Sequence, residues 1–375
     1  MGCPQAETYT VCIIYIKPLE MRAITVMLDE RFDSVPVAHG DTNDYSLGRI
    51  GHHNVVVVGP ARGDQGKVAT AQFASTIRLT FPSLCAGMLV GIGGGMPHYP
   101  DDDVRLGDVV VGAPETGPAV VQYDLGKRTE AGFEVTRNLS QPPKLLRQVV
   151  NKVEEKYDYI RDGEDDILKA HIDRFAMYPR LKKEFMKPSA PDRLFQSSFV
   201  HEDGTDCANH DRQFEVLRHN RELDHIVVHC STILSGDSVM KSSTDRDLLS
   251  AKHNNALCIE MEAAGLMDVF PCLVIRGICD YADSHKNSIW QNFAAATAAA
   301  TAAAYAREVL LNMSKQTVPE LGATVGQANA MGSQDGLNNP LAGGSFSIGS
   351  LKNSGNVMYH NSAPMTNHFG TRATR

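Results

Sequence analysis

Acidic residues interrupt the apolar stretch between residues 258 and 283. Glu260 and Glu262 precede a helix-like run, and Asp280 closes a strand-like run that begins at Leu273. An ionised carboxylate in apolar surroundings is costly unless it is paired, so we expect its pKa to rise. A carboxyl group that keeps its proton near neutral pH can serve as a general acid. The same residues could instead cap a helix and end a strand, and the pattern alone leaves both interpretations open.

Short β-branched apolar runs alternate with helical stretches along the chain. The runs that predict strands are 9–16, 55–58, 84–90, 109–111, 225–229 and 273–278. The stretches that predict helices are 17–30, 67–79, 141–157 and 290–311, the last of them rich in Ala. Continuous apolar strands between helices are typical of a mostly parallel sheet covered on both faces. The expected fold class is therefore α/β, a single domain with a mixed, mostly parallel central sheet flanked by helices.

The composition changes at two places. Residues 158–225 are charged and irregular, which predicts an insertion within a catalytic domain that spans 8–314. This insertion could shape the substrate entrance or an oligomer contact, or it could be a passive surface excursion. After about residue 315, Gly, Asn, Ser and Thr replace large apolar residues, which predicts a flexible tail over 315–375.

Charge and cysteine usage argue against several classes of protein. The net charge is −8 and no Lys/Arg block occurs, so we expect no nucleic-acid partner. No apolar run approaches the length of a membrane span, and the N-terminus lacks a signal core. The eight cysteines show no framework spacing, which indicates a reducing, cytoplasmic location. His201, Cys207 and His210 make an incomplete zinc spacing, so we expect neither a metal nor an organic cofactor.

Several ordered motifs resemble the nucleoside phosphorylase superfamily. They are Glu-Met-Glu-Ala at 260–263, Val-Ile-Arg-x-Ile-x-Asp-x-Ala-Asp at 274–283, Leu-Gly-Arg-Ile-Gly-His-His-Asn-Val-Val at 47–56, and Cys-Asp-Tyr-Ala-Asp-Ser-His-Lys-Asn at 279–287. The resemblance covers about 8–313 and is greatest to the methylthioadenosine/S-adenosylhomocysteine nucleosidase branch, in the fungal type found with NACHT-type signalling proteins. It implies a nucleoside phosphorylase-like fold, a small purine nucleoside or nucleotide as substrate, and a homo-oligomer, with a dimer expected.

The resemblance also implies roles in cleaving the ribosyl–purine bond. Asp280 would protonate N7 of the purine, and Glu20 would activate water. Glu262 would accept hydrogen bonds from the ribose hydroxyls, with Met261 packed against the sugar. Arg276 would help to hold the ribose and would orient Glu262 by a bidentate contact. From the residues alone, an ordinary first-turn acid of a helix is the favoured interpretation of Glu20, and only the resemblance reverses that preference.

Further residues are expected to complete the pocket. Glu260 is expected to point to the opposite side by local alternation, without a catalytic role. The base would lie against Ser238, Val239, Met240 and Cys279, where Cys279 replaces the Ser usual in the resembling enzymes. A glycine-rich strand-to-loop turn would let the backbone approach the nucleoside at Gly91, Gly93 and Gly94. If the substrate carries phosphates, their contacts would be Arg62, Lys67 and Lys241.

The glycine-rich segment bears on which nucleophile is used. Phosphorylases of the superfamily carry an Arg shortly before it and a Ser or Thr within it, to grip phosphate. This chain has Met88, Leu89 and Val90 before it, and Ile92 in place of the hydroxyl. The resemblance therefore favours a purine N-ribosyl hydrolase, with a phosphate-dependent purine nucleoside phosphorylase as the alternative.

A third interpretation is an immune- or incompatibility-type effector module, with ATP as a candidate substrate. Residues 344–361 place spaced apolar residues in a Gly/Asn/Ser background. Such segments can stack as cross-β ladders, and this one resembles the amyloid-type motifs that recruit fungal effectors to NACHT-type partners. A plain disordered tail remains the alternative.

Overall fold

The computed structural model describes residues 3–309, apart from 65, 131, 140, 161–165, 202–211 and 222–224. The predicted tail over 315–375, with its cross-β motif, lies outside the described residues. Cys207 and His210, two of the three residues considered for zinc, also lie outside them.

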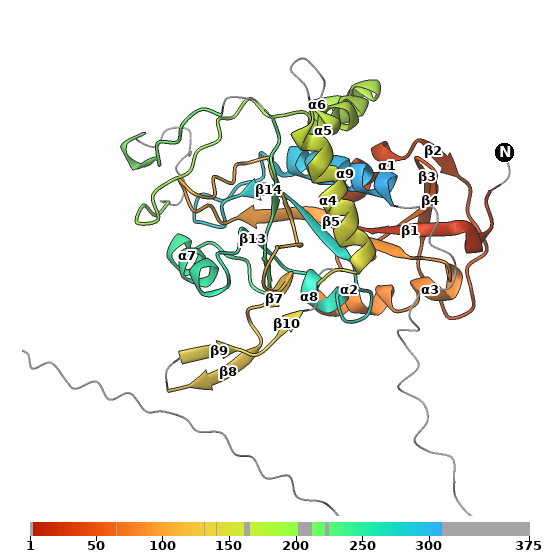
Figure 1. Cartoon of the computed structure of the whole chain (residues 1–375), viewed down its shortest axis with the longest axis horizontal. Helices are drawn as coiled ribbons and strands as arrows, with labels where there is room; N and C mark the ends of the chain where they lie inside the picture. The colour runs from red at the N-terminus through yellow and green to blue at the C-terminus, as the bar shows by residue number, and fades with distance from the viewer. Residues whose placement is uncertain are drawn as a thin grey trace, which may run out of the picture. The chain divides into compact units, whose positions relative to one another are not determined.

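Twelve strands of the described part form one mixed sheet (Figure 1). They are β1 (Tyr9–Ile14), β2 (Glu30–Phe32), β3 (Tyr45–Ile50), β4 (His53–Val58), β5 (Ala86–Gly95), β6 (Val109–Val111), β7 (Val120–Gln122), β10 (Asn138–Leu139), β11 (Val228–Cys230), β12 (Ile233–Ser235), β13 (Cys258–Glu260) and β14 (Leu273–Asp280). The main path runs β10-β7-β12-β13-β5-β1-β4-β3-β2, and β14, β6 and β11 branch from β5. A separate hairpin of β8 (Gly126–Thr129) and β9 (Gly132–Val135) projects beside β7 and β10.

Strand β5 is the centre of this sheet. It pairs in parallel with β1 and β14, and in antiparallel with β13 at Gly94 and Gly95. All ten of its residues are buried. The predicted strand-to-loop turn at 91–95 is therefore wrong, because the strand continues through Gly95. Glycine is needed here because neighbouring side chains fill the space of a Cβ; at Gly91 they are Glu20 and Arg276.

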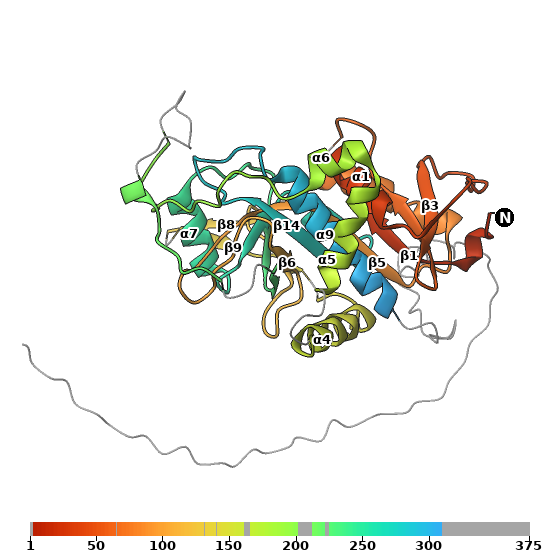
Figure 2. The same ribbon diagram turned by 90° about the horizontal axis from the view of Figure 1, so that it is seen from above.

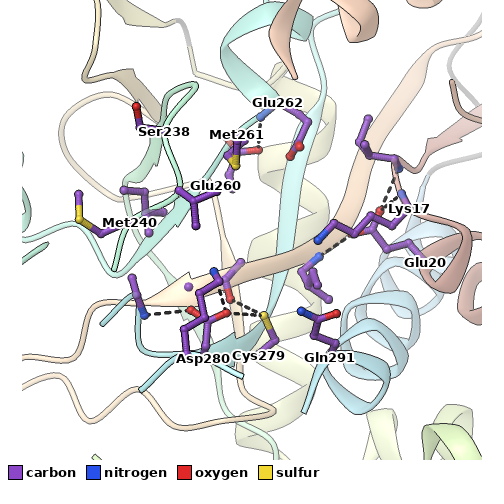
Figure 3. Close-up of a pocket in the computed structure, with 18 residues that line it drawn as sticks. Lys17, Glu20, Ser238, Met240, Glu260, Met261, Glu262, Cys279, Asp280 and Gln291 are labelled. Atoms are coloured by element: carbon purple, nitrogen blue, oxygen red, sulfur yellow. Dashed lines mark hydrogen bonds and ion pairs between the residues drawn. The ribbon is translucent and has the colours of Figure 1, made fainter. Parts of the chain in front are cut away.

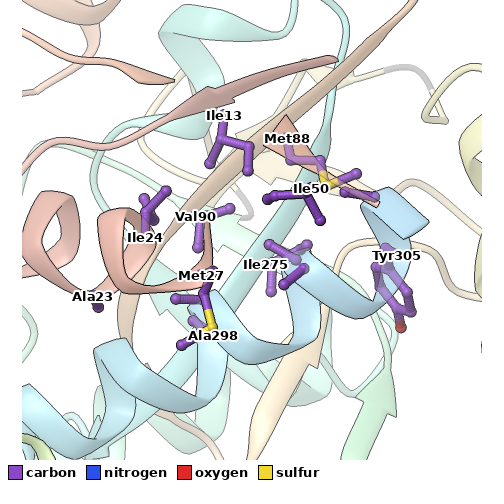
Figure 4. Packing of buried hydrophobic residues seen from close by; sticks show 14 of the residues in the cluster. Ile13, Ala23, Ile24, Met27, Ile50, Met88, Val90, Ile275, Ala298 and Tyr305 are labelled. Atoms are coloured by element: carbon purple, nitrogen blue, oxygen red, sulfur yellow. The ribbon is translucent and has the colours of Figure 1, made fainter. Parts of the chain in front are cut away.

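Helices cover both faces of the sheet, which confirms the α/β expectation. One face packs against α1 (Pro18–Met27), α4 (Lys144–Asp158), α5 (Ile167–Ile172), α6 (Pro179–Phe185) and α9 (Gln291–Glu308). The other packs against α2 (Lys67–Ala74), α3 (Ile77–Thr80) and α8 (Ala263–Leu266). Alternate residues of β1 serve the two cores, since Ile13 faces the α1/α9 side (Figure 4) and Cys12 faces the other. The run 9–16 is continuously apolar for this reason.

The Ala-rich helix α9 is the main support of the strand that carries Asp280. It runs along β14 and β5 in the view of Figure 2 and is buried over most of its length. Its small side chains allow an approach so close that a Cβ at Gly277 would overlap the carbonyl oxygen of Ala294. Within the described residues, no helix combines the length and apolar character that a membrane crossing requires.

The described part of the insertion is more regular than predicted. It contains α5, α6 and a 3-10 helix at Asp173–Met177. Asp166 caps α5 by accepting the N–H of Leu168 at 2.8 Å. Phe175 and Phe185 stack at 5.1 Å between ring centroids and join the main core. The expectation of an irregular segment is thus wrong for residues 167–185, because short helices dock their few apolar residues onto the sheet's helical layer, whereas residues 186–201 are irregular as predicted.

Candidate active site

A pocket lies near the carboxyl ends of β1, β12, β13 and β14 (Figure 3). Such ends are where open α/β sheets bind ligands. The pocket has a volume of about 360 Å³. It is lined by Ile16, Lys17, Glu20, Ile92, Gly93, Gly94, Ser238, Val239, Met240, Ile259, Glu260, Met261, Glu262, Cys279, Asp280, Ala282, Lys286 and Gln291. Three acids far apart in the sequence, Glu20, Glu262 and Asp280, therefore meet around one cavity.

Glu20 enters the pocket from the first turn of α1. Its Oε2 accepts the backbone N–H groups of Ile16 at 2.9 Å and Lys17 at 2.8 Å, and its Oε1 accepts that of Ile92 at 3.0 Å. The bond from Lys17, the N-cap residue, is what an ordinary first-turn acid makes. The bond from Ile92 is different, because it ties the carboxylate to the central strand. Glu20 is 2% exposed, so three backbone donors hold an acceptor at the pocket wall.

Glu260 lies on the same side as Glu262, which corrects the prediction from alternation. Both line the pocket, and both bind Nη2 of Arg276: Glu260 by a short ion pair and Glu262 at 3.4 Å. Strand β13 ends at Glu260, and Glu262 has φ −126° and ψ −35°, so the alternation of a strand no longer applies. Glu260 also accepts the N–H groups of Glu262 at 3.1 Å and Ala263 at 3.0 Å. The capping interpretation thus describes Glu260, and the predicted bidentate contact of Arg276 with Glu262 is not formed.

Arg276 is a buried support for the acids and does not line the pocket. It is 0% exposed; burial opposes its charge, but the carboxylates of Glu260, Glu262 and Glu20 outweigh burial and raise its pKa. Within the described part of the chain, its Nε has no hydrogen-bond partner. The prediction that Arg276 helps to hold the ribose directly is therefore wrong. Arg276 acts indirectly, because it binds Glu260 and balances the negative charge of the three glutamates.

The surroundings of Glu262 raise its pKa to about 7. Burial contributes most to this rise; Arg276 opposes it, whereas the charges of Glu260 and Glu20 add to it, and Lys17 opposes it again. The expectation of a raised pKa for a carboxyl group in this stretch agrees with the structure at Glu262. Such a group exchanges between its protonated and ionised forms near neutral pH.

Asp280 is the last residue of β14 and is held by donors on both oxygens. Its Oδ1 accepts the N–H of Ala282 at 2.9 Å. Its Oδ2 lies 3.0 Å from Nζ of Lys286 and accepts the Sγ–H of Cys279 at 3.0 Å. Cys279 thus supplies the bond that a Ser would otherwise make. Burial keeps the pKa of the Cys279 thiol well above its usual value, so this residue stays a donor.

The positive charges of the pocket differ from those predicted. Arg62, Lys67 and Lys241 do not line it, and the ammonium group of Lys67 pairs with Asp124 at 2.8 Å and with Asp237 at 3.1 Å. Lys17 and Lys286 line it instead, together with Gln291 at the start of α9. Both lysines lie close in sequence to a predicted catalytic acid, since Lys17 precedes Glu20 by three residues and Lys286 follows Asp280 by six. This proximity could have identified them as pocket residues.

The predicted base-binding residues all line the pocket. Ser238 and Val239 stand at an exposed rim, Met240 is half-buried, and Cys279 is buried. Met261, predicted to contact the sugar, lies between the two glutamates. Gly93 and Gly94 line the pocket as predicted, whereas Gly91 does not. The lining therefore combines apolar faces with six charged side chains, those of Lys17, Glu20, Glu260, Glu262, Asp280 and Lys286.

A second cavity, of about 110 Å³, is also lined by Asp280. Both cavities are lined by Cys279 and Asp280, and the second also by Pro191, Arg193 and Phe195 of the insertion. Arg218 of the insertion donates to the hydroxyl of Tyr281 at 2.9 Å. The described part of the insertion thus contacts the residue that follows Asp280, and none of its residues lines the main pocket. Among the described residues, no cluster of three His, Cys, Asp or Glu side chains is suited to a metal ion.

Comparison with known proteins identifies the fold. Futalosine hydrolase of Helicobacter pylori shares 18% identity over 80% of this chain and 98% of its own, with a TM-score of 0.51. The 5′-methylthioadenosine/S-adenosylhomocysteine nucleosidase of Neisseria meningitidis shares 16% over 80% and 98%, also with a TM-score of 0.51. The predicted nucleoside phosphorylase-like fold is confirmed. No family model matches the sequence.

Curated relatives are similar to parts of the chain. A nucleotide-binding leucine-rich repeat (NLR)-like protein of the fungus Hyaloscypha variabilis is 37% identical over 318 residues, 83% of this chain. The ATP nucleosidase Cap17 of Escherichia coli is 33% identical over 85 residues, 21% of this chain. The matches span only 30% and 17% of the lengths of these two relatives.

Proposed function

We propose that this chain, which has the fold of the nucleosidases compared above, is a purine N-ribosyl hydrolase. It cleaves the N-glycosidic bond of purine nucleosides or adenine nucleotides and yields the free base with ribose or ribose phosphate. The observation that carries this proposal is the meeting of Glu20, Glu262 and Asp280 around one cavity with apolar walls. No metal or cofactor has a role in it.

Each acid suits one requirement of an oxocarbenium-like transition state. Glu262, with a pKa of about 7, accepts the ribose hydroxyls and lies close to the positive charge that develops on the sugar. Asp280 passes a proton to N7 of the departing purine. Glu20 accepts a proton from the attacking water, since its carboxylate is held by backbone donors that leave lone pairs available.

Water is favoured over phosphate as the nucleophile by the side chains near Glu20. At the position where phosphorylases of the superfamily use a hydroxyl, Ile92 lines the pocket and its N–H is engaged by Glu20. Lys286 pairs with Asp280, so this cation already has a partner. Lys17 is the pocket cation that could bind phosphate if the chain were a phosphorylase. The test therefore compares base release with and without phosphate.

ATP is included among the candidate substrates for two reasons. A stretch of 85 residues is similar to an ATP nucleosidase, and Lys17 stands at the pocket, where it could neutralise a phosphate. A second candidate role, as the effector module of a signalling protein, is supported by the similarity of 83% of the chain to an NLR-like protein. In that role the same chemistry would deplete a purine nucleotide.

The test is to incubate the purified chain with adenosine, inosine, methylthioadenosine and ATP, with and without phosphate, and to measure free base by chromatography. We expect base release that is independent of phosphate and yields ribose or ribose phosphate. Release that requires phosphate and yields a ribose 1-phosphate would make the chain a phosphorylase.

The matched variants are Glu20→Gln and, as control, Glu7→Gln, which changes an exposed glutamate outside the pocket. We expect Glu20→Gln to lower kcat with little change in melting temperature, and Glu7→Gln to retain activity. Wild-type rates in Glu20→Gln would remove Glu20 from the mechanism. Absence of base release from every substrate would refute the proposed function as a whole.

A further inference from the structure

The proton for the purine cannot already reside on Asp280 while it forms its ion pair. Its buried carboxylate accepts a backbone N–H, a thiol S–H and the ammonium of Lys286, at 2.9, 3.0 and 3.0 Å. In the ion pair with Lys286 the carboxylate carries no proton of its own, although the three donors leave one lone-pair site that can receive one. A second group must therefore supply the proton that Asp280 hands on.

Of the described side chains, two that carry a proton touch Asp280 and also line the pocket: the thiol of Cys279 and the ammonium of Lys286. Cys279 is fully buried, and burial and the neighbouring Asp280 raise its pKa well above the usual value. Release of its proton would leave a buried thiolate beside the carboxylate of Asp280. Lys286 differs, because its loss of a proton leaves a neutral amine, and its side chain is 28% exposed.

The backbone places Lys286 for this role. Its N–H bonds to the carbonyl of Asp283 at 3.3 Å, in a turn that folds the chain back after β14. Cys258 and Cys279 are the titratable neighbours that influence the charge of Lys286. Lys17 and Asp283 are further charged groups close to this cluster. Burial opposes the charge of Lys286, but Asp280, Cys279 and Cys258 together outweigh burial and raise the pKa of Lys286.

We propose that Lys286 is a positioning residue that supplies, through Asp280, the proton taken up by the leaving purine; this rests on the proposed function. As the C1′–N9 bond breaks, its electron pair passes to the purine. Lys286 gives a proton to the carboxylate of Asp280, and Asp280 passes that proton on to N7. Water adds to C1′ and loses a proton to Glu20. Proton exchange with solvent then restores Lys286 and Glu20, so the sum is hydrolysis alone.

The negative charge that gathers on the base drives this transfer. Before the bond breaks, the attraction between Asp280 and Lys286 keeps the proton on the amine. When the purine begins to leave, a second negative charge forms beside the pair, and protonation of the purine removes it. Lys286 thus keeps its proton within the ion pair and releases it only when the glycosidic bond breaks.

The test uses Lys286→Met and Lys286→Arg on the substrate that the wild type cleaves and on its N7-methylated counterpart, whose base carries a positive charge without a proton. We expect Lys286→Met to lower kcat for the ordinary substrate at least about a hundredfold and to cleave the methylated substrate close to the wild-type rate. Arginine keeps the ion pair but does not release its proton, so Lys286→Arg should not restore purine release.

Two controls make the outcome decisive. Lys169→Met breaks another lysine–aspartate pair, the exposed pair between Lys169 of α5 and Asp173. This variant should keep wild-type activity. The double variant Lys286→Met/Asp280→Asn should be no slower than the slower single variant, because both act in one step.

Several results would overturn the proposal. Wild-type rates in Lys286→Arg would show that charge alone matters. Equal losses on both substrates in Lys286→Met would show a structural role. A wild type that releases no base would refute the proposed function itself, whereas an active wild type with unaffected Lys286 variants would refute only this inference.

Discussion

Replacement of Glu262 by Gln isolates the energetic consequence of burying this carboxyl group. In the folded chain its pKa rises from 4.5 to about 7, mainly because burial disfavours the ionised form. One pKa unit corresponds to about 1.4 kcal/mol, so the rise is equivalent to about 3 kcal/mol of folding free energy.

The sign of the pH dependence follows from which state binds the proton more tightly. Since the folded chain holds this proton more tightly than the unfolded chain, the contribution of Glu262 is fully present below about pH 4.5 and is lost as the pH rises through about 7. The glutamine side chain of the variant has no proton to lose. The free energy of unfolding of Glu262→Gln, minus that of the wild type, should therefore increase by up to about 3 kcal/mol between about pH 4.5 and about pH 8.

The measurement is urea unfolding of the wild type, Glu262→Gln and the exposed control Glu7→Gln across this pH range, followed by circular dichroism. For Glu7→Gln, the difference in the free energy of unfolding from the wild type should not show the change with pH that is expected for Glu262→Gln. A difference between Glu262→Gln and the wild type that stays constant with pH would refute the reasoning, because Glu262 would then titrate alike in both states.

Three further predictions concern the acid and its supports. Asp280→Asn should lower kcat for purine release about a hundredfold to ten-thousandfold with an intact melting curve; an active variant would exclude Asp280 as the proton donor. Arg276→Met should lower the free energy of unfolding by about 3–5 kcal/mol, because Glu260 stays buried without its cation, and adding Glu260→Gln should recover part of the loss; an unchanged denaturation midpoint would contradict this. Gly277→Ala should cost on the order of 3 kcal/mol because a methyl group would overlap the backbone of α9. Gly112→Ala, where the nearest atoms lie at 3.4 Å, is its matched control, and equal melting temperatures for the two variants would contradict the close packing.

Local pattern was sufficient to predict the elements that carry Glu20 and Asp280. Continuous β-branched runs predicted the buried strands, and β14 starts at Leu273, as expected, and ends on Asp280. The Ala-rich stretch predicted the buried helix α9. The three-residue strands β12 and β13 were missed, because so few residues show no period. The equally short β6 was predicted because all three of its residues are Val.

The sequence by itself determined the set of acids, the helix start that presents Glu20 and the strand that presents Asp280, because burial and periodicity can be recognised from neighbouring residues. Only the tertiary structure decided their partners. Glu260 rather than Glu262 takes the closest contact with Arg276, and Lys286 rather than Lys67 stands at the acid. These choices depend on where β13 stops and on how the chain turns after β14, and such turns depend on contacts between residues distant in sequence.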